Sequence, residues 1–216
     1  RPTLLWMKDW VGLDLLFGVG SFCALMLLCG VWAGPACLGV WACYLSLMVV
    51  GEPFLSFQWD SLLLETCLLS LFFLPWKPLD RFRNNRPPKM LARLLLVGLL
   101  FKLMFESGVV KFTYFAPDGS NAWSEGSAPA YHYWTQPVPN GASWFFHHLF
   151  PQSHSFFLWS VYFIEIALPF FFFMPRNLRH FAFAGQVALQ VAIMLSGNYG
   201  YFNLLTLVLC VLLVDD

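Results

Sequence analysis

Seven long apolar stretches follow one another along this chain of 216 residues, and they leave few folds open to it. They cover residues 11–33, 35–50, 61–75, 91–110, 156–174, 181–196 and 202–214. Because 59% of the residues are hydrophobic and only 11% are charged, a soluble globule of this length could not bury all the apolar side chains. The sequence therefore predicts an all-α membrane protein, a polytopic bundle of transmembrane helices.

The lengths of the stretches set the expected number of crossings. A helix needs roughly 20 apolar residues to span the hydrocarbon core of a bilayer. The stretches 61–75 and 202–214 are shorter than this, so we expect five to seven membrane segments. We also expect a single transmembrane domain, residues 1–216, that is a fragment of a longer protein, because the chain lacks an initial methionine and stops directly after an apolar run.

A turn and an orientation can be predicted from smaller features. Gly34 and Pro35 predict a helical hairpin between the first two stretches, because proline cannot continue a helix. The loops 76–93 and 175–180 are rich in Lys and Arg, which places both on the cytoplasmic side. Residues 111–155 then lie on the lumenal or periplasmic side, where their many aromatic side chains predict an extramembrane cap loop.

Several classes of function receive no support from the composition. A formal net charge of zero gives no basic surface for nucleic acid, so we expect no nucleic-acid partner. The six cysteines lie in or beside apolar stretches and form no CxxC pair, which is typical of small buried hydrophobes rather than of a metal or redox site. A GxSxG nucleophile motif is also missing. We therefore predict no catalytic residue, no metal and no cofactor.

Four histidines, His132, His147, His148 and His154, share the loop 111–155. Four imidazoles on one face could ligate a transition metal or relay protons. Their neighbours are mainly Tyr, Trp and Phe, a composition typical of an aromatic belt at the membrane interface. The sequence favours this interfacial interpretation over a metal site or a catalytic site.

Polar side chains inside or beside apolar stretches are the functional candidates, because ionisable groups are costly in a membrane. They form an expected intramembrane polar cluster with its cap: Asp60, Glu65, Lys102, Glu106, His132, Glu165 and Asn198. We expect the five charged residues of this set, which lie in or directly beside the apolar stretches, to turn inward. Two interpretations remain open, a structural network between helices and a pathway for a substrate or proton.

Individual pairings can be predicted within this set. Lys102 and Glu106 are four residues apart, so they can pair on one helix face. Glu65 needs a partner from another helix, for which Lys102 is the first candidate. Asp60 is expected to be the N-cap of a helix that starts at Ser61. The amides of Gln186, Gln190 and Asn198 can also hydrogen-bond between helices.

Five sequence blocks carry a resemblance to a known family. They are FLSFQWDSLLLE (54–65), FKLMFESGVVKF (101–112), YHYWTQPVPN (131–140), WFFHHL (144–149) and SGNYGYFNLLTLVLCVLLVDD (196–216). In this order and spacing they resemble the lipase maturation factor family over nearly the whole chain. The segment 117–129, PDGSNAWSEGSAP, departs from the tryptophan-rich segment usual in that family.

The resemblance implies a non-enzymatic role. It implies a multi-pass protein of the endoplasmic reticulum membrane, or of the inner membrane in a bacterium, that acts as a chaperone in protein folding. Its expected partners are the lipid bilayer and secreted homodimeric lipases such as lipoprotein lipase, whose folding and assembly it would assist. The family usually carries a further lumenal domain after this region, and client binding there lies outside this chain.

An enzymatic alternative rests on a more distant resemblance to the membrane bundle of the vitamin K-dependent carboxylase. It makes the protein a membrane enzyme or redox protein that acts on a lipidic or quinone-like molecule. Lys102 would be the general base, supported by Glu106, Glu65 and His132. A lysine that faces an open cavity would favour this enzyme, and a lysine closed against a carboxylate would favour the scaffold.

Overall fold

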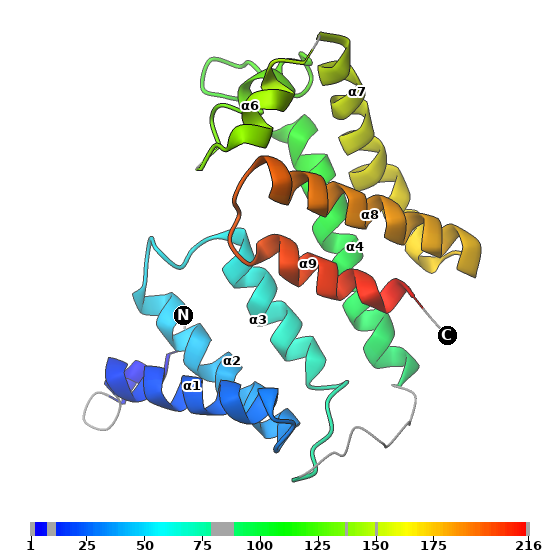
Figure 1. Ribbon diagram of the computed structural model, residues 1–216. Coiled ribbons are helices and arrows are strands. Elements are labelled where there is room, and N and C mark those ends of the chain that lie inside the picture. The colour runs from blue at the N-terminus through cyan, green and yellow to red at the C-terminus, as the bar shows by residue number, and fades with distance from the viewer. Residues whose placement is uncertain (1–2, 8–11, 79–88, 137, 150, 215–216) are drawn as a thin grey trace. The chain divides into compact units, whose positions relative to one another are not determined.

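The computed structural model describes residues 3–7, 12–78, 89–136, 138–149 and 151–214, and its regular elements there are helices (Figure 1). The α-helices are α1 (Leu13–Leu28), α2 (Ala33–Val50), α3 (Gln58–Ser70), α4 (Met90–Thr113), α5 (Ala128–His132), α6 (Gly141–His147), α7 (Pro151–Tyr162), α8 (Arg176–Ser196) and α9 (Phe202–Cys210). Shorter helical turns are η1 (Leu4–Trp6), η2 (Phe163–Ala167), η3 (Leu168–Phe173) and η4 (Val211–Leu213). Each predicted apolar stretch coincides with a helix, which confirms the all-α class.

Three helical segments are long and apolar enough to cross a membrane by length and composition. They are Ala33–Val50, Ser153–Phe173 and Arg176–Ser196. Leu13–Leu28 and Phe202–Leu213 are shorter apolar helices. The prediction of a helical membrane bundle is confirmed at this level. The orientation of the bundle stays a prediction, and the basic loop on which it partly depends falls largely on residues 79–88, outside the described part of the chain.

The chain divides into two compact units, Arg1–Leu96 and Val97–Asp216, and each is described by itself. In the first unit, α1 packs against α2 and α2 packs against α3. The predicted hairpin is present, but its turn precedes Gly34 and Pro35, because α1 ends at Leu28 and α2 begins at Ala33. Proline is tolerated in the first turn of a helix, where its missing N–H has no partner to lose.

Asp60 lies inside the first turn of α3 in the first unit, because the helix begins at Gln58. The prediction of an N-cap at Asp60 is therefore wrong by three positions. The carboxylate still serves the helix start, since it accepts a hydrogen bond from the N–H of Phe57 at 3.1 Å. Its other oxygen accepts the hydroxyl of Tyr44 from α2, which ties α3 to its neighbour.

The second unit holds a broken helix and the aromatic-rich segment that was predicted to form a cap. The segments α7, η2 and η3 follow one another without a gap from Pro151 to Phe173, and both η2 and η3 contact α8. Helix α8 also contacts α9 and the short α6, while α5 packs against α7. The Nδ2 of Asn140, which caps α6, donates to the carbonyl of Leu195 near the end of α8 at 2.9 Å. The aromatic-rich segment is thus joined to the helices by defined contacts.

Candidate functional site

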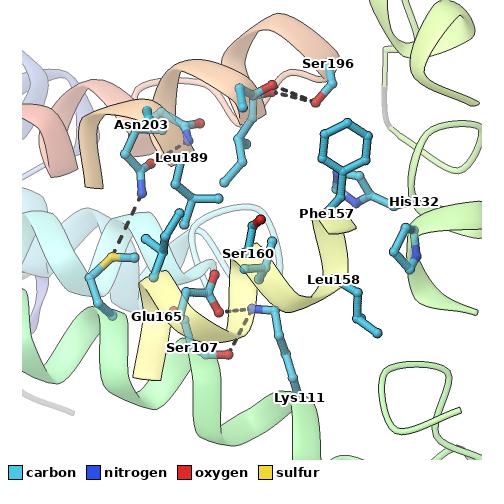
Figure 2. Close-up of a pocket in the computed structure, with 18 of the residues that line it drawn as sticks. Ser107, Lys111, His132, Phe157, Leu158, Ser160, Glu165, Leu189, Ser196 and Asn203 are labelled. Atoms are coloured by element: carbon cyan, nitrogen blue, oxygen red, sulfur yellow. Dashed lines mark hydrogen bonds and ion pairs between the residues drawn. The ribbon is translucent and has the colours of Figure 1, made fainter. Parts of the chain in front are cut away.

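A cavity of about 500 Å³ lies within the second unit, between α4, α5, α7, α8 and α9 (Figure 2). Its walls are mostly apolar and come from side chains such as Leu103, Phe157, Leu189 and Phe202. A smaller set of polar side chains also lines it: Ser107, Lys111, His132, Ser160, Glu165, Gln190, Ser196, Tyr199, Asn203 and Thr206. A concave apolar space with a few polar groups is the usual form of a small-molecule site.

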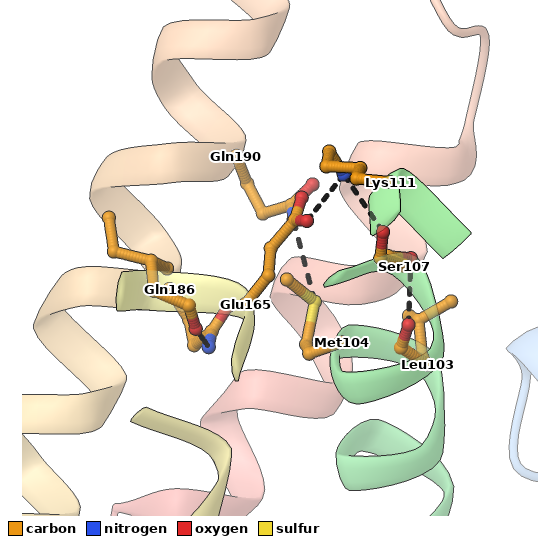
Figure 3. Close-up of polar contacts among 8 residues, drawn as sticks. Leu103, Met104, Ser107, Lys111, Glu165, Gln186 and Gln190 are labelled. Carbon is orange, nitrogen blue, oxygen red and sulfur yellow. Dashed lines mark hydrogen bonds and ion pairs between the residues drawn. The ribbon is translucent and has the colours of Figure 1, made fainter. Parts of the chain in front are cut away.

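Lys111 and Glu165 form an ion pair at this cavity (Figures 2 and 3). Lys111 stands in the last turn of α4 and Glu165 in η2. The ammonium also donates to the carbonyl of Ser107 at 3.0 Å and lies 4.8 Å from the centre of the Trp123 ring. The two charged side chains are only 14% and 7% exposed, so each supplies the charge that compensates the other in a place with little water.

Glu165 stands in a π-helical turn, in which the backbone bonds reach five residues back. Pro169 follows this turn and has no N–H, so it cannot donate to the carbonyl of Ile164. The Nε2 of Gln186, on α8, donates to that carbonyl at 2.8 Å instead (Figure 3). A side chain of the neighbouring helix thus replaces the hydrogen bond that the proline removes.

We expect Gln186→Met to destabilise the protein, because it keeps the side-chain volume but leaves the Ile164 carbonyl without its donor. An unsatisfied buried backbone group costs about 1–3 kcal/mol. Thermal unfolding of the detergent-solubilised protein should show a lower midpoint. Gln58→Met, at an exposed glutamine, is the matched control and should leave the midpoint unchanged. Equal midpoints for both variants would contradict this role of Gln186.

A second polar link joins α8 to α9 beside the cavity. The Nδ2 of Asn203 donates to the Oε1 of Gln190 at 2.7 Å, and the Nε2 of Gln190 lies 4.0 Å from the sulfur of Met104. Asn203 is 1% exposed, and none of the described residues donates a hydrogen bond to its Oδ1. Buried polar oxygens are nearly always satisfied, so this oxygen is an acceptor without a described donor, on a residue that lines the cavity.

His132, at the end of α5, faces the cavity from the cap (Figure 2). Its Nε2 lies 2.7 Å from the Nε2 of Gln136, and its ring stands edge-on to Tyr133. Burial lowers the pKa of His132, and the positive charge of Lys111 lowers it further. Lys111 acts on this imidazole through its charge, and the hydrogen bond of the ring goes to Gln136.

The lowered pKa of His132 predicts that stability falls on acidification. Below its unperturbed pKa of about 6.5, a histidine in the unfolded chain takes up a proton that the folded protein resists. The contribution of the neutral His132 imidazole to the stability of the folded protein is therefore fully present above about pH 6.5 and is lost as the pH falls below it. We expect the melting temperature to drop less between pH 7 and pH 5 in His132→Gln than in the wild type. His148→Gln, at an exposed histidine, should keep the wild-type slope.

The loop that departs from the family pattern is tied to this site. The Nδ2 of Asn121 donates to the carbonyl of Lys111 at 3.0 Å, next to the end of α4. The hydroxyl of Tyr162 donates to the carbonyl of Trp123 at 2.8 Å, which holds the indole under the Lys111 ammonium. The segment therefore positions one wall of the cavity.

The other loop histidines stand among aromatic rings. The ring of His147 stacks on Trp134, and His148 packs against Trp144, whose carbonyl lies 2.8 Å from its Nδ1. His154 lies beside Tyr133. Over the residues that the structure describes, no group of three or more His, Cys, Asp and Glu side chains could hold a metal ion.

The structure separates the predicted candidates. Glu165 and His132 line the cavity, whereas Lys102 and Glu106 are exposed on α4. The two lysines lie on opposite faces of α4, because Lys102 comes nine residues before Lys111 and a helix turns ~100° per residue. Lys102 and Glu106 therefore do not turn toward this cavity, and their inward orientation in the complete bundle stays a prediction.

The remaining candidates lie elsewhere. Asp60 is buried and Glu65 is half-buried, both on α3 of the first unit. A pair of Glu65 with Lys102 would join the two units and stays a prediction. Asn198 is exposed between α8 and α9, where its Oδ1 accepts the N–H of Gly200 at 3.0 Å. It therefore closes a local turn instead of the predicted bond between helices, because it lies past the end of α8.

Among the site residues that were not candidates are Lys111, Gln190 and Asn203. Lys111 was assigned to the start of the loop, but α4 continues to Thr113. The feature of the sequence that could have indicated Lys111 was Glu165, because a buried acid requires a cation as its partner. Gln190 was expected to bond between helices, and it does, but the sequence offered no sign that Asn203 would be its partner.

Comparisons with known proteins agree with the resemblance read from the sequence. The family model described as the lipase maturation factor transmembrane domain matches residues 1–216. Lipase maturation factor 2 of Homo sapiens is 44% identical over 232 residues, and that of Xenopus tropicalis 42% over 229. Lipase maturation factor 1 of Homo sapiens is 34% identical over 231 residues.

Each of these matches covers the whole of this chain. The chain spans about a third of the length of the relatives, 32%, 31% and 38% respectively. No solved structure matches it.

Proposed function

Because this chain belongs to the lipase maturation factor family, we propose that it is the membrane-embedded part of a protein that assists the folding and assembly of secreted lipases. We place this protein in the membrane of the endoplasmic reticulum. The region acts as a scaffold rather than as an enzyme. It anchors the longer protein and holds the cap segment 128–149 over one end of its helices.

The closed Lys111–Glu165 pair carries the scaffold proposal. The ammonium is bound to a carboxylate and to the carbonyl of Ser107, so it is not positioned to take a proton from a substrate. Interhelical contacts of this kind lock α4 to η2. Of the groups that the enzymatic alternative would use in this unit, Lys102, Glu106 and His132, only His132 lines the cavity.

The test is secretion of an active lipase. Cells that lack their own lipase maturation factors are supplied with the complete protein that carries this chain, and the activity of secreted lipoprotein lipase is measured per amount of secreted lipase. We expect the complete protein to restore the activity. Failure of the correctly located protein to restore it would overturn the proposal.

A second version of the protein separates scaffold from enzyme. Lys111→Met with Glu165→Leu removes both charges together and leaves no unpaired ion in the bundle. A scaffold should keep most of its ability to restore lipase activity, provided that the protein accumulates at the wild-type level. Complete loss of restoration at wild-type abundance would show that these charges do chemical work, and it would contradict the scaffold role.

A further inference from the structure

The cavity of the second unit has the properties of a lipid site. Its volume of about 500 Å³ lies within the range of ~300–1,000 Å³ that is usual for small-molecule sites. The wall contains the apolar side chains of Leu103, Phe156, Phe157, Leu189 and Ile193. These side chains can contact only the hydrocarbon part of a ligand. Apolar cavities exclude water and accept apolar molecules. The shape and lining therefore select a ligand with a hydrocarbon chain.

The charges at the cavity select against an ionised ligand. Lys111 and Glu165 compensate each other, and the lowered pKa of His132 keeps its imidazole neutral near pH 7. Lys111 carries the only ammonium among the described residues that line the cavity, and a carboxylate or phosphate would find it already bound to Glu165. It would also approach that buried carboxylate as a like charge, which is unfavourable in a site with little water.

One unfilled position points to the polar part of the ligand. Asn203 lines the cavity (Figure 2), and its Oδ1 is buried and receives no hydrogen bond from the residues that the structure describes. An acceptor in this position calls for an O–H or N–H donor on the ligand. The Nδ2 of the same amide is already bound to Gln190, so the free position can only accept.

We propose that this cavity binds one uncharged, single-chain amphiphile whose hydroxyl group donates to Asn203, such as a monoacylglycerol or a long-chain alcohol. The hydrocarbon chain lies along the apolar wall of α7 and α8. The head lies at the polar set of α4 and α9. This binding is independent of the proposed role in lipase assembly, because it concerns the second unit alone.

The test compares ligands that differ in the head. The purified complete protein is delipidated in detergent, and binding of 1-monooleoylglycerol, methyl oleate and oleate is measured by native mass spectrometry and by tritiated-ligand saturation. We expect saturable binding of 1-monooleoylglycerol, at least tenfold tighter than binding of methyl oleate, which has no hydroxyl donor. Oleate at neutral pH should bind more weakly still.

Variants locate the site. Asn203→Leu should abolish the preference for 1-monooleoylglycerol over methyl oleate while methyl oleate binds as before. Ile193→Trp should fill the cavity and prevent binding of both. Leu195→Trp, at an exposed position of the same helix, is the matched control and should bind like the wild type. If Ile193→Trp fails to fold, Ala188→Trp, also at the cavity wall, replaces it.

Three results would overturn the proposal. They are absence of saturable binding, tighter binding of oleate than of 1-monooleoylglycerol, and an unchanged head-group preference in Asn203→Leu. Each is read on purified protein without a lipase present. A failed secretion assay and a failed binding assay are therefore separate outcomes, and neither implies the other.

Discussion

Replacing Lys111 with methionine should lower the melting temperature of the detergent-solubilised protein by roughly 10 °C. The substitution leaves Glu165 buried without its cation, and loss of one partner of a buried pair costs about 3–5 kcal/mol, which in a chain of this length shifts the midpoint by that order. The midpoint is measured by heating samples of the protein and using size-exclusion chromatography to determine how much folded protein remains at each temperature. The same substitution at the exposed Lys89, near the start of α4, should change the midpoint little.

A double variant tests whether the pair itself is responsible. Adding Glu165→Leu to Lys111→Met removes the second charge, and replacement of a whole buried pair by apolar side chains is often neutral. We expect the double variant to recover most of the lost stability. A double variant as unstable as Lys111→Met alone would mean that another contact of the ammonium, such as that with the Trp123 ring, matters more than the ion pair.

Gly108→Ala should destabilise the second unit by about 1–3 kcal/mol, the usual cost of overpacking. The added Cβ would lie 2.5 Å from the Cγ1 of Ile166 and 3.3 Å from the Cβ of Glu165, so α4 and the π-helical turn could no longer approach as closely. Small residues allow such close contact between membrane helices. The effect is measured as a lower midpoint in the same unfolding assay.

Gly98 provides the matched control for this change. It lies on the same helix, and a Cβ added there would meet nothing within 4 Å. Gly98→Ala should therefore leave the midpoint unchanged or raise it slightly, because alanine favours the helix. If both alanine variants behave alike, the close approach of α4 to the turn is not what holds this part of the bundle.

The positions of the helices could be predicted well, because a long apolar run in a chain with few charges has few alternatives to a helix. The ends were less certain. The hairpin turn was placed at Gly34 and Pro35 because proline disfavours helix, but this proline is tolerated at a helix start. The start of α3 was placed too late because Asp60 was taken as the residue before the helix. It instead lies inside the first turn, where its carboxylate accepts the N–H of Phe57.

The site was only partly predictable, because sequence distance says little about which helix faces meet. Glu165 stood out as a buried acid, and His132 as an imidazole near the helix ends. Lys111, the partner of Glu165, is 54 residues away from it in the sequence and seemed to belong to a loop. Lys102 was preferred because it stands in the middle of an apolar run, but the turn of the helix directs it to the other face.

The broken helix of the second unit has a consequence for the order of synthesis. The carbonyl of Ile164 obtains its hydrogen bond from Gln186, a residue that leaves the ribosome after the whole segment 151–173. Until α8 has been synthesised, the Ile164 carbonyl of the nascent chain has no donor within the chain. An unsatisfied backbone carbonyl costs free energy in the hydrocarbon core of a membrane. We infer that these two segments enter the membrane as a pair and not one after the other. A chain truncated before residue 186 should then remain bound to the insertion machinery instead of moving into lipid.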